Sequence, residues 1–306
     1  MKALVTGAGG FVGAHLAARL VADGWEVVGT TRPGSPPWRL GALGVEGAVE
    51  VVEADLARRD ATGDVTRAAD PDVAFLLAAA RSSATEAEKA ATAAVNGFSA
   101  QWLVEALGDR CRAVIRLGSS TEYADTPGPM DEHTPVRPRG FFGATKAAGS
   151  RLVVAAADRR SLRSAVLRAF QVYGPLDHPT RLVPSALRAA RLGHTLPLTG
   201  LGLRRDWVFV EDVVDACVRA ANADDLPPGQ VLNVGTGRQV TNETLVAEVA
   251  RVSGRPLAVG PGIHPGRDWD SESWVCDPTL AGELLGWKAE VDLAEGLARC
   301  WAAEPS

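Results

Sequence analysis

The sequence predicts an α/β fold built on a doubly wound parallel sheet, with a second and smaller α/β part. Short, nearly continuous apolar runs alternate with segments of helical periodicity, which is typical of parallel strands buried on both faces. A glycine-rich turn follows the first apolar run and leads straight into a helical segment. Because crossovers between parallel strands are right-handed, this alternation predicts helices on both faces of one twisted sheet.

The first half of the chain predicts six strands and three helices. Residues 11–22 have helical spacing, since Val12, Leu16 and Leu20 fall on one face. Residues 84–107 are expected to form one long helix and residues 141–157 another. The apolar runs expected to be strands are 2–6, 26–30, 49–53, 72–78, 113–117 and 164–170.

The second half is less regular. Its helices are expected at 182–192, 211–223 and 241–252, and its strands at 206–210 and 231–234. Pro227, Pro228 and Gly229 predict a turn between two of these elements. The Pro- and Gly-rich stretch 256–265 predicts a loop or a short edge strand.

The composition of the 306 residues excludes several classes of protein. With 46% hydrophobic and 23% charged residues, the chain is not disordered, collagen-like or a coiled coil. Its net charge of −5 offers no broad basic field, so nucleic acid is not an expected partner. The four cysteines form no CxxC pair, which predicts neither a metal site nor a disulfide framework. No signal-peptide pattern and no apolar run of about 18 residues occurs, so we expect a cytoplasmic protein without a membrane span.

The turn after the first strand has the spacing of a phosphate-binding loop. Gly7 permits a tight turn, Gly10 lets the backbone approach a pyrophosphate, and Gly13 allows close packing of the helix. The pyrophosphate then faces the N-terminal N–H groups of the helix, at Phe11 and Val12, where the helix dipole favours an anion. The strand–turn–helix context predicts a dinucleotide cofactor.

The end of the second strand bears on which dinucleotide is bound. A binder of NAD usually places Asp or Glu there to accept a hydrogen bond from the ribose 2′-hydroxyl. This strand instead runs into Thr31 and Arg32. Because a guanidinium can pair bidentately with a 2′-phosphate, Arg32 favours NADP, with NAD as the alternative.

Several further segments occur in an order that is characteristic of one family. They are Asp55-Leu56, residues 77–80, Asn96 and residues 118–123, 167–175, 205–213, 232–235 and 285–287. On these segments nearly the whole chain resembles the extended short-chain dehydrogenases/reductases, especially the nucleotide-sugar epimerase/dehydratase/reductase group. The resemblance implies a dinucleotide-binding part at 1–173 and 206–234, and a substrate-binding part at 174–205 and 235–306. It also implies that Asp55 and Leu56 touch adenine, and that Ala78 and Ala79 lie under the cofactor.

The resemblance implies a catalytic set in which one member is missing. Ser120 stands in the place of the family's catalytic Ser or Thr, and Lys146 in the place of the lysine that holds the nicotinamide ribose. Phe142 stands where the family has the tyrosine that exchanges a proton as hydride moves. Glu122 stands where sugar dehydratases keep a proton-abstracting glutamate.

Four explanations of Phe142 remain open at this point. The chain is a deliberate Tyr-to-Phe variant, or a natural enzyme whose proton comes from Glu122, water or a substrate hydroxyl. As a third alternative, it binds ligand without turnover. In the fourth, Tyr123, one of only two tyrosines in the chain, takes over the role.

The resemblance also implies the substrate class. Arg205 and Arg267 fall where the family holds a substrate diphosphate, and Gln171 replaces an asparagine usual in the same region. We therefore expect an NADP-dependent oxidoreductase that transfers hydride at a carbonyl or hydroxyl carbon of a nucleotide-activated keto-sugar. The alternatives are a nucleotide-sugar epimerase or 4,6-dehydratase, a tyrosine-less ketoreductase for a metabolite such as a polyketide, and a catalytically silent NADP-binding protein. A homodimer through the helices at 84–107 and 141–157 is expected from the resemblance alone.

Overall fold

The computed structural model describes residues 1–81, 84–262 and 271–303 and contains a seven-stranded, fully parallel sheet. The strand order is β3-β2-β1-β4-β5-β6-β10, so the chain winds outward in both directions from β1 and confirms the doubly wound fold. The strands are β1 (Lys2–Thr6), β2 (Glu26–Thr31), β3 (Val49–Glu53), β4 (Val73–Leu76), β5 (Ala113–Ser119), β6 (Arg163–Ala169) and β10 (Gln230–Val234).

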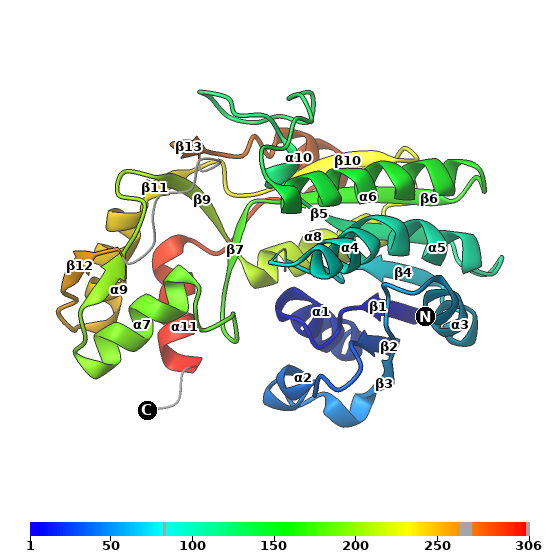
Figure 1. Cartoon of the computed structure of the whole chain (residues 1–306), viewed down its shortest axis with the longest axis horizontal. Helices are drawn as coiled ribbons and strands as arrows, with labels where there is room; N and C mark the ends of the chain where they lie inside the picture. The colour runs from blue at the N-terminus through cyan, green and yellow to red at the C-terminus, as the bar shows by residue number, and fades with distance from the viewer. Residues whose placement is uncertain (82–83, 263–270, 304–306) are drawn as a thin grey trace.

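Helices cover both faces of this sheet (Figure 1). Helices α1 (Phe11–Ala22), α2 (Trp38–Ala42) and α8 (Val210–Asn222) pack on one face, and α3 (Arg59–Ala69), α5 (Ser99–Ala106) and α6 (Phe141–Asp158) on the other. Successive strand residues alternate between the two cores: Phe75 and Ile115 point to the α1 side, whereas Ala74 and Val114 point to the α6 side.

The long helix expected at 84–107 is interrupted. It consists of α4 (Glu86–Ala93), one π-helical turn named η2 (Ala94–Phe98) and α5. Thr85 caps its start by accepting a hydrogen bond from the N–H of Glu88. Helix α3 was not expected, because the residues it buries are mostly small or polar and show no apolar period: Thr62, Gly63, Val65, Thr66 and Ala69.

A second, four-stranded sheet forms the smaller part of the molecule. It has the order β11-β9-β13, and β7 also pairs with β9. Its strands are β7 (Gln171–Tyr173), β9 (Arg204–Phe209), β11 (Gln239–Thr241) and β13 (Ser273–Trp274). Strand β7 and residues 206–209 of β9 fall within the range expected for the dinucleotide-binding part, although they pair with each other in the smaller sheet.

Three helices and a small strand pair among the described residues complete the second part. The pair is β8 (Leu196–Leu198) with β12 (Val259–Pro261), and β12 is the edge strand that the stretch 256–265 allowed. The helices are α7 (Leu182–Leu192), α9 (Asn242–Ser253) and α11 (Leu293–Ala303), whereas α10 (Thr279–Leu285) packs against β10 and α8 of the larger part. Helices α7, α9 and α11 pack with β9 around Tyr173 and Phe209.

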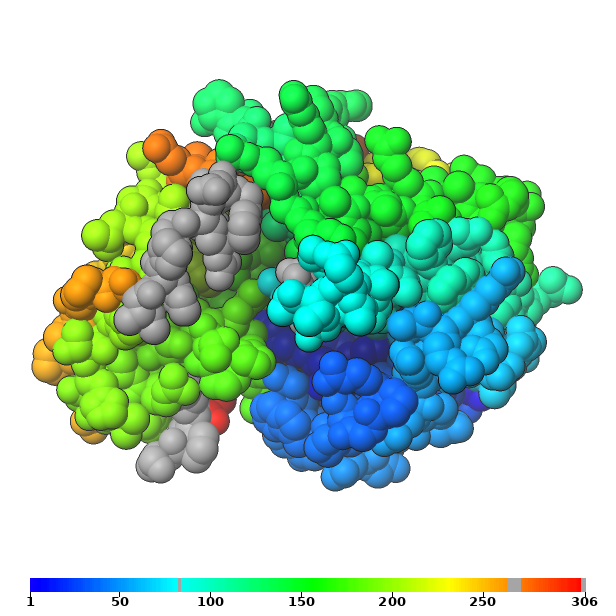
Figure 2. All heavy atoms as spheres, in the orientation of Figure 1, coloured from blue at the N-terminus to red at the C-terminus, as the bar shows by residue number. Residues whose placement is uncertain are grey.

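The two parts meet around β7, which continues from β6 and leads into the smaller sheet (Figure 1). Figure 2 shows the surface hollowed between them, with the N-terminal segment, in dark blue, visible on the floor of the hollow. None of the helices in the described part of the chain is both long and apolar enough to cross a membrane.

Candidate functional site

The phosphate turn, residues 7–13, has the geometry that its glycines predicted. Gly7 adopts a φ of 73°, and a Cβ there would lie 2.9 Å from Ala78 Cα. A Cβ on Gly13 would overlap the carbonyl oxygen of Gly7, so only glycine lets α1 begin this close to the turn. Gly10 caps α1 without any side-chain hydrogen bond, and the first turn of the helix contains no acidic residue. The turn therefore forms a cradle for an anion at a helix N-terminus.

The segments beside this turn place the other expected cofactor residues. Thr6 Oγ1 accepts hydrogen bonds from the N–H groups of Leu77, at 3.1 Å, and Ala78, at 3.2 Å, which ties the end of β4 to the turn. Leu56 is buried in a small cluster that Ala78 contacts, and Asp55 is exposed at the end of β3. These groups fit a dinucleotide laid across the carboxyl ends of β1, β4 and β3.

Arg32 lies at the end of β2, where an acidic residue would select NAD. Its guanidinium is exposed and makes one long hydrogen bond, 3.4 Å, to Ser35 Oγ. A cation at this position suits an added phosphate on the ribose better than a hydroxyl.

The serine turn after β5 carries three hydroxyl side chains that differ in their exposure. This turn is the short helix η3 (Ser120–Glu122), and Ser120 itself is only 7% exposed. Ser119 and Thr121 are half-buried, and their hydroxyl oxygens lie 2.8 Å apart. The catalytic role of Ser120 stays a prediction, and the more exposed pair Ser119 and Thr121 offers two further hydroxyls at the same turn. Strand alternation was the signal that could have found this pair, because it turns every second side chain toward the opposite face.

The first turn of α6 packs directly on this serine turn. A Cβ on Gly143 would overlap the carbonyl oxygen of Thr121, so the start of α6 lies against the backbone of this turn. The guanidinium of Arg81 lies over the ring of Phe142, 4.4 Å from its centre. Phe142 therefore presents a ring to the site but no exchangeable proton.

Lys146 is buried one turn further along α6. Its Nζ donates to the carbonyl oxygen of Leu117, near the end of β5. Burial, followed by the nearby charge of Arg116, lowers the pKa of Lys146 to about 7, while Glu122 opposes the shift. This lysine therefore changes its charge near neutral pH.

Glu122, which stands where sugar dehydratases keep a proton-abstracting glutamate, is held inside the protein. Its side chain is 0% exposed, and its Oε2 accepts from Arg168 Nε at 3.0 Å. Its Oε1 accepts from the N–H of Ser119 at 2.9 Å and from Ser150 Oγ at 3.1 Å. Since both oxygens are held inside the protein, the carboxylate fixes the serine turn instead of meeting substrate.

Tyr123 is equally unavailable, which contradicts the proposal that it replaces the missing tyrosine. It is 1% exposed, and its hydroxyl donates to Asn233 Oδ1 at 2.7 Å. Burial raises the pKa of Tyr123 to about 12. Arg168 lies over its ring, so Tyr123 and Glu122 belong to one buried network below the site.

Two of the residues expected to bind substrate, Gln171 and Arg205, lie on the smaller sheet. Gln171 and Trp207 are register partners on β7 and β9, and Arg205 lies two residues earlier on the face of Trp207. Arg205 donates to the carbonyl oxygen of Ser271 at 2.8 Å. The indole Nε1 of Trp207 is buried without a partner among the described residues, a feature that the sequence did not reveal. Arg267 lies outside the described residues.

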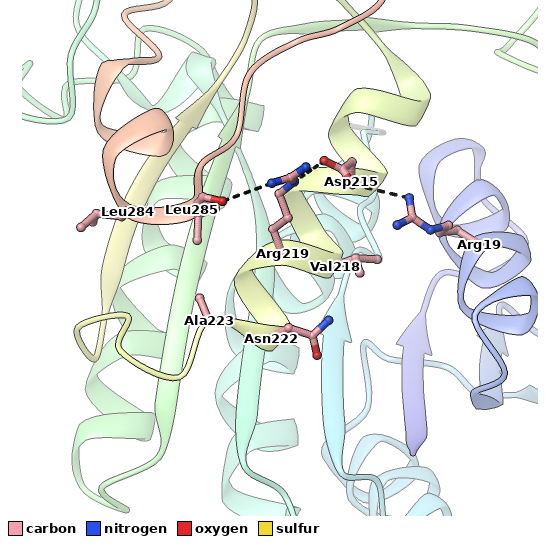
Figure 3. Close-up of a pocket in the computed structure, with 8 residues that line it drawn as sticks. All are labelled: Arg19, Asp215, Val218, Arg219, Asn222, Ala223, Leu284 and Leu285. Atoms are coloured by element: carbon pink, nitrogen blue, oxygen red, sulfur yellow. Dashed lines mark hydrogen bonds and ion pairs between the residues drawn. The ribbon is translucent and has the colours of Figure 1, made fainter.

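A hollow between α1, α8 and α10 is separate from this site (Figure 3). Its charged side chains bind one another: Asp215 lies 3.6 Å from Arg19 Nη1 and 2.6 Å from Arg219 Nε. Arg219 also donates to the carbonyl oxygens of Leu285 and Gly286. The charges of this hollow are therefore paired rather than turned toward a common ligand.

Comparisons with known proteins agree with this geometry. A family model described as the NAD dependent epimerase/dehydratase family matches residues 3–235. The UDP-glucose 4-epimerase of Mycolicibacterium smegmatis is 35% identical over 98% of this chain and 97% of its own. The structure of MoeE5 in complex with UDP-glucuronic acid and NAD is 32% identical, with a TM-score of 0.85 over 99% of this chain and 98% of that one. The UDP-glucose 4-epimerase of Thermotoga maritima with UDP-glucose has a TM-score of 0.87 at 25% identity, over 99% and 98% of the two chains.

Proposed function

Because the chain belongs to the NAD-dependent epimerase/dehydratase family of extended short-chain dehydrogenases/reductases, we propose that it transfers hydride at a carbonyl or hydroxyl carbon of a nucleotide-activated sugar. The observation that carries the substrate class is the match, over nearly the full length of both chains, to relatives named for nucleotide sugars. The face of the smaller sheet that bears Gln171, Arg205 and Trp207 is where we place the nucleotide sugar.

The residues of the chain divide the work of binding and chemistry. The phosphate turn binds the cofactor pyrophosphate through the N–H groups at the start of α1. When bound, the pyridine nucleotide accepts or supplies the hydride. The hydroxyl pair of Ser119 and Thr121 orients the reacting oxygen of the substrate, because it is the half-buried polar pair beside Phe142. Arg205 binds a phosphate of the substrate.

We propose NADP as the preferred cofactor, with NAD as the alternative. The support is the exposed Arg32 at the end of β2, for which the described residues supply one long hydrogen bond, to Ser35. The solved relative MoeE5 was crystallised with NAD, so the preference requires a direct measurement.

The test of the function is a panel of nucleoside-diphosphate hexoses and their 4-keto derivatives, incubated with NADPH, NADH or no added nucleotide. Net reduction of a keto-sugar consumes the reduced nucleotide, and the long-wavelength absorbance of that nucleotide falls. Epimerisation or dehydration changes the sugar, followed by NMR, without net consumption of nucleotide. The Lys146→Met variant is the control. If neither readout changes with any member of the panel, the proposed substrate class is wrong.

We further propose that the chain forms a homodimer through α4, α5 and α6 in the cytoplasm. The support for the dimer is an exposed aromatic pair on this surface: Phe98 is 50% exposed and stacks on Trp102 at 5.9 Å. The support for a reducing compartment is that all four cysteines are buried and free. Light scattering on the Phe98→Glu variant tests the dimer, which should dissociate to a monomer.

A further inference from the structure

An arginine lies in the middle of a buried strand of the large sheet. Arg116 belongs to β5, between Ile115 and Leu117, and is 2% exposed. Its Nη2 donates to the carbonyl oxygen of Asn96, in the π-helical turn η2. Its Nε is buried and finds no partner among the described residues. Burying a guanidinium that has no acidic partner of its own destabilises the folded state, because the charge loses its hydration.

The guanidinium of Arg116 presses on the face of α6 that carries Lys146. A Cβ on Gly149 would overlap Arg116 Nη2 and the carbonyl oxygen of Asn96, so glycine is what lets the guanidinium reach this place. Gly149 follows Lys146 by three residues, which puts both on the same face of the helix. Lys146 in turn donates to Leu117, the residue that follows Arg116 on β5.

Three charged groups from three elements face Lys146. They are Arg116 from β5, Glu122 from η3 and Arg81 from the segment after β4. Only Glu122 is acidic, and it is held by Arg168 at 3.0 Å. The buried cations Arg116, Lys146 and Arg168 therefore outnumber the single buried carboxylate, and the excess positive charge disfavours a proton on Lys146.

We propose that Lys146 is the acid–base group of this chain, in place of the absent phenol, and that the buried guanidinium of Arg116 gives it this role by crowding it with positive charge. Arg116 is a positioning residue, since it acts through Lys146 and does not touch substrate. The inference rests on the proposed function only for the identity of the substrate.

The proton balance of the step is complete within the proposed reaction. During oxidation of the substrate, the carbon–hydrogen pair leaves as hydride to the oxidised nucleotide. The hydroxyl proton moves through an intervening hydroxyl to the lone pair of the unprotonated Lys146 Nζ, and the carbonyl double bond forms. Reduction reverses both transfers, with the protonated amine as the donor.

Nitrogen NMR of the lysine side chains tests the charge coupling without any substrate. The chain has four lysines, so a protein labelled with 15N-lysine gives four side-chain signals, and the Lys146→Arg variant identifies one of them. We expect that signal to titrate near neutral pH, about three pH units below the ordinary value of a lysine. In Arg116→Gln, which keeps a donor for Asn96, it should titrate about one pH unit higher or more.

Arg163→Gln is the matched control, because Arg163 donates to the carbonyl oxygens of Ala221 and Ala223 at the other side of β6. It should leave the Lys146 signal in place. Arg116→Met removes the same charge with an apolar side chain, and serves if Arg116→Gln does not fold. The inference is overturned if Lys146 titrates with the other lysines, or if neither Arg116 variant moves it.

Turnover gives an independent readout. In Arg116→Gln, the limb of the pH–rate profile near neutral pH should shift by the same amount as the NMR titration. Lys146→Arg keeps its charge at all these pH values, so its turnover should fall at least 100-fold while it still binds cofactor. If the substrate class is wrong, the assay stays silent while the NMR shift is still present. An absent NMR shift refutes the inference whatever the turnover shows.

Discussion

The phosphate turn and the catalytic segment, residues 119–123 and 142–146, lie at the same edge of the sheet but are built differently. In the phosphate turn the backbone is the site: Gly7 and Gly13 shape a cradle that a Cβ would fill. In the catalytic segment the side chains are the site, and Phe142, Glu122 and Lys146 all have surroundings that the resemblance did not anticipate. A backbone cradle leaves no choice of residue, whereas a side-chain role can pass to a neighbour of suitable charge.

The sharpest test of the phosphate turn, whose backbone forms the site, is Gly13→Ala. The added methyl would overlap the carbonyl oxygen of Gly7, so the turn must move away from the start of α1. We expect the dissociation constant for cofactor to rise by more than about 100-fold, and the free energy of unfolding to fall by about 1–3 kcal/mol. Calorimetric titration and urea denaturation measure the two effects. Gly47→Ala, at a glycine with nothing near its Cβ position, is the control.

The segment at residues 119–123 and 142–146, whose side chains form the site, is tested by comparing Ser119→Ala with Ser120→Ala. Because Ser119 is half-buried and pairs with Thr121 whereas Ser120 is buried, we expect only the first change to lower kcat, by about 100-fold. The second should alter kcat by less than about threefold and act mainly on thermal stability. Equal losses in both variants, or the reverse order, would return the catalytic role to Ser120.

The preference of the chain for NADP or NAD is tested by Arg32→Ala. Loss of the guanidinium should weaken the binding of NADPH by about tenfold and leave the binding of NADH nearly unchanged, since only NADPH has the added phosphate. Fluorescence titration with both nucleotides gives the ratio. A chain that prefers NADH before the change would contradict the NADP proposal.

The pH dependence of stability tests the buried charge of Lys146. Its pKa is about 7 in the folded chain and about 10.4 in an unfolded one, so between these values the unfolded state binds more protons. Stability should therefore rise with pH across this window, by at most about 1.4 kcal/mol per pH unit from this group. Urea denaturation at pH 7 and pH 9 measures the slope, and Lys146→Met should reduce it. An unchanged slope would mean that the lysine keeps its proton in the folded chain.

Phe142→Tyr is the change for which we expect the smallest effect. Since Lys146 already exchanges the proton in our proposal, the added phenol should alter kcat by less than about tenfold. Steady-state turnover of the two forms on the same substrate is the measurement. A gain of about 10²–10⁴ would show instead that the chain as it stands is an enzyme that lacks its acid–base group.

The parts of the fold that followed from local pattern were predictable. The apolar strands of the large sheet, helix α1 and the glycine turn all appear where the sequence indicated them. Helix α3 was missed because its buried residues are small and polar, and the π turn inside 84–107 was missed because periodicity does not distinguish it from an α-helix. The pairing of β7 with β9 was missed because strands of three to six residues reveal nothing of their partners.

By itself, the sequence determined the doubly wound sheet, the phosphate turn and the absence of a hydroxyl at residue 142, since each depends on residue types within a short segment. Only the tertiary structure decided the fates of Glu122 and Tyr123, because burial against Arg168 and Asn233 removes both from the site. It also decided the role proposed for Lys146, whose proton affinity depends on Arg116, thirty positions earlier in the chain. Burial and the charges of distant residues set the chemistry of a side chain, and neither is written in its local sequence.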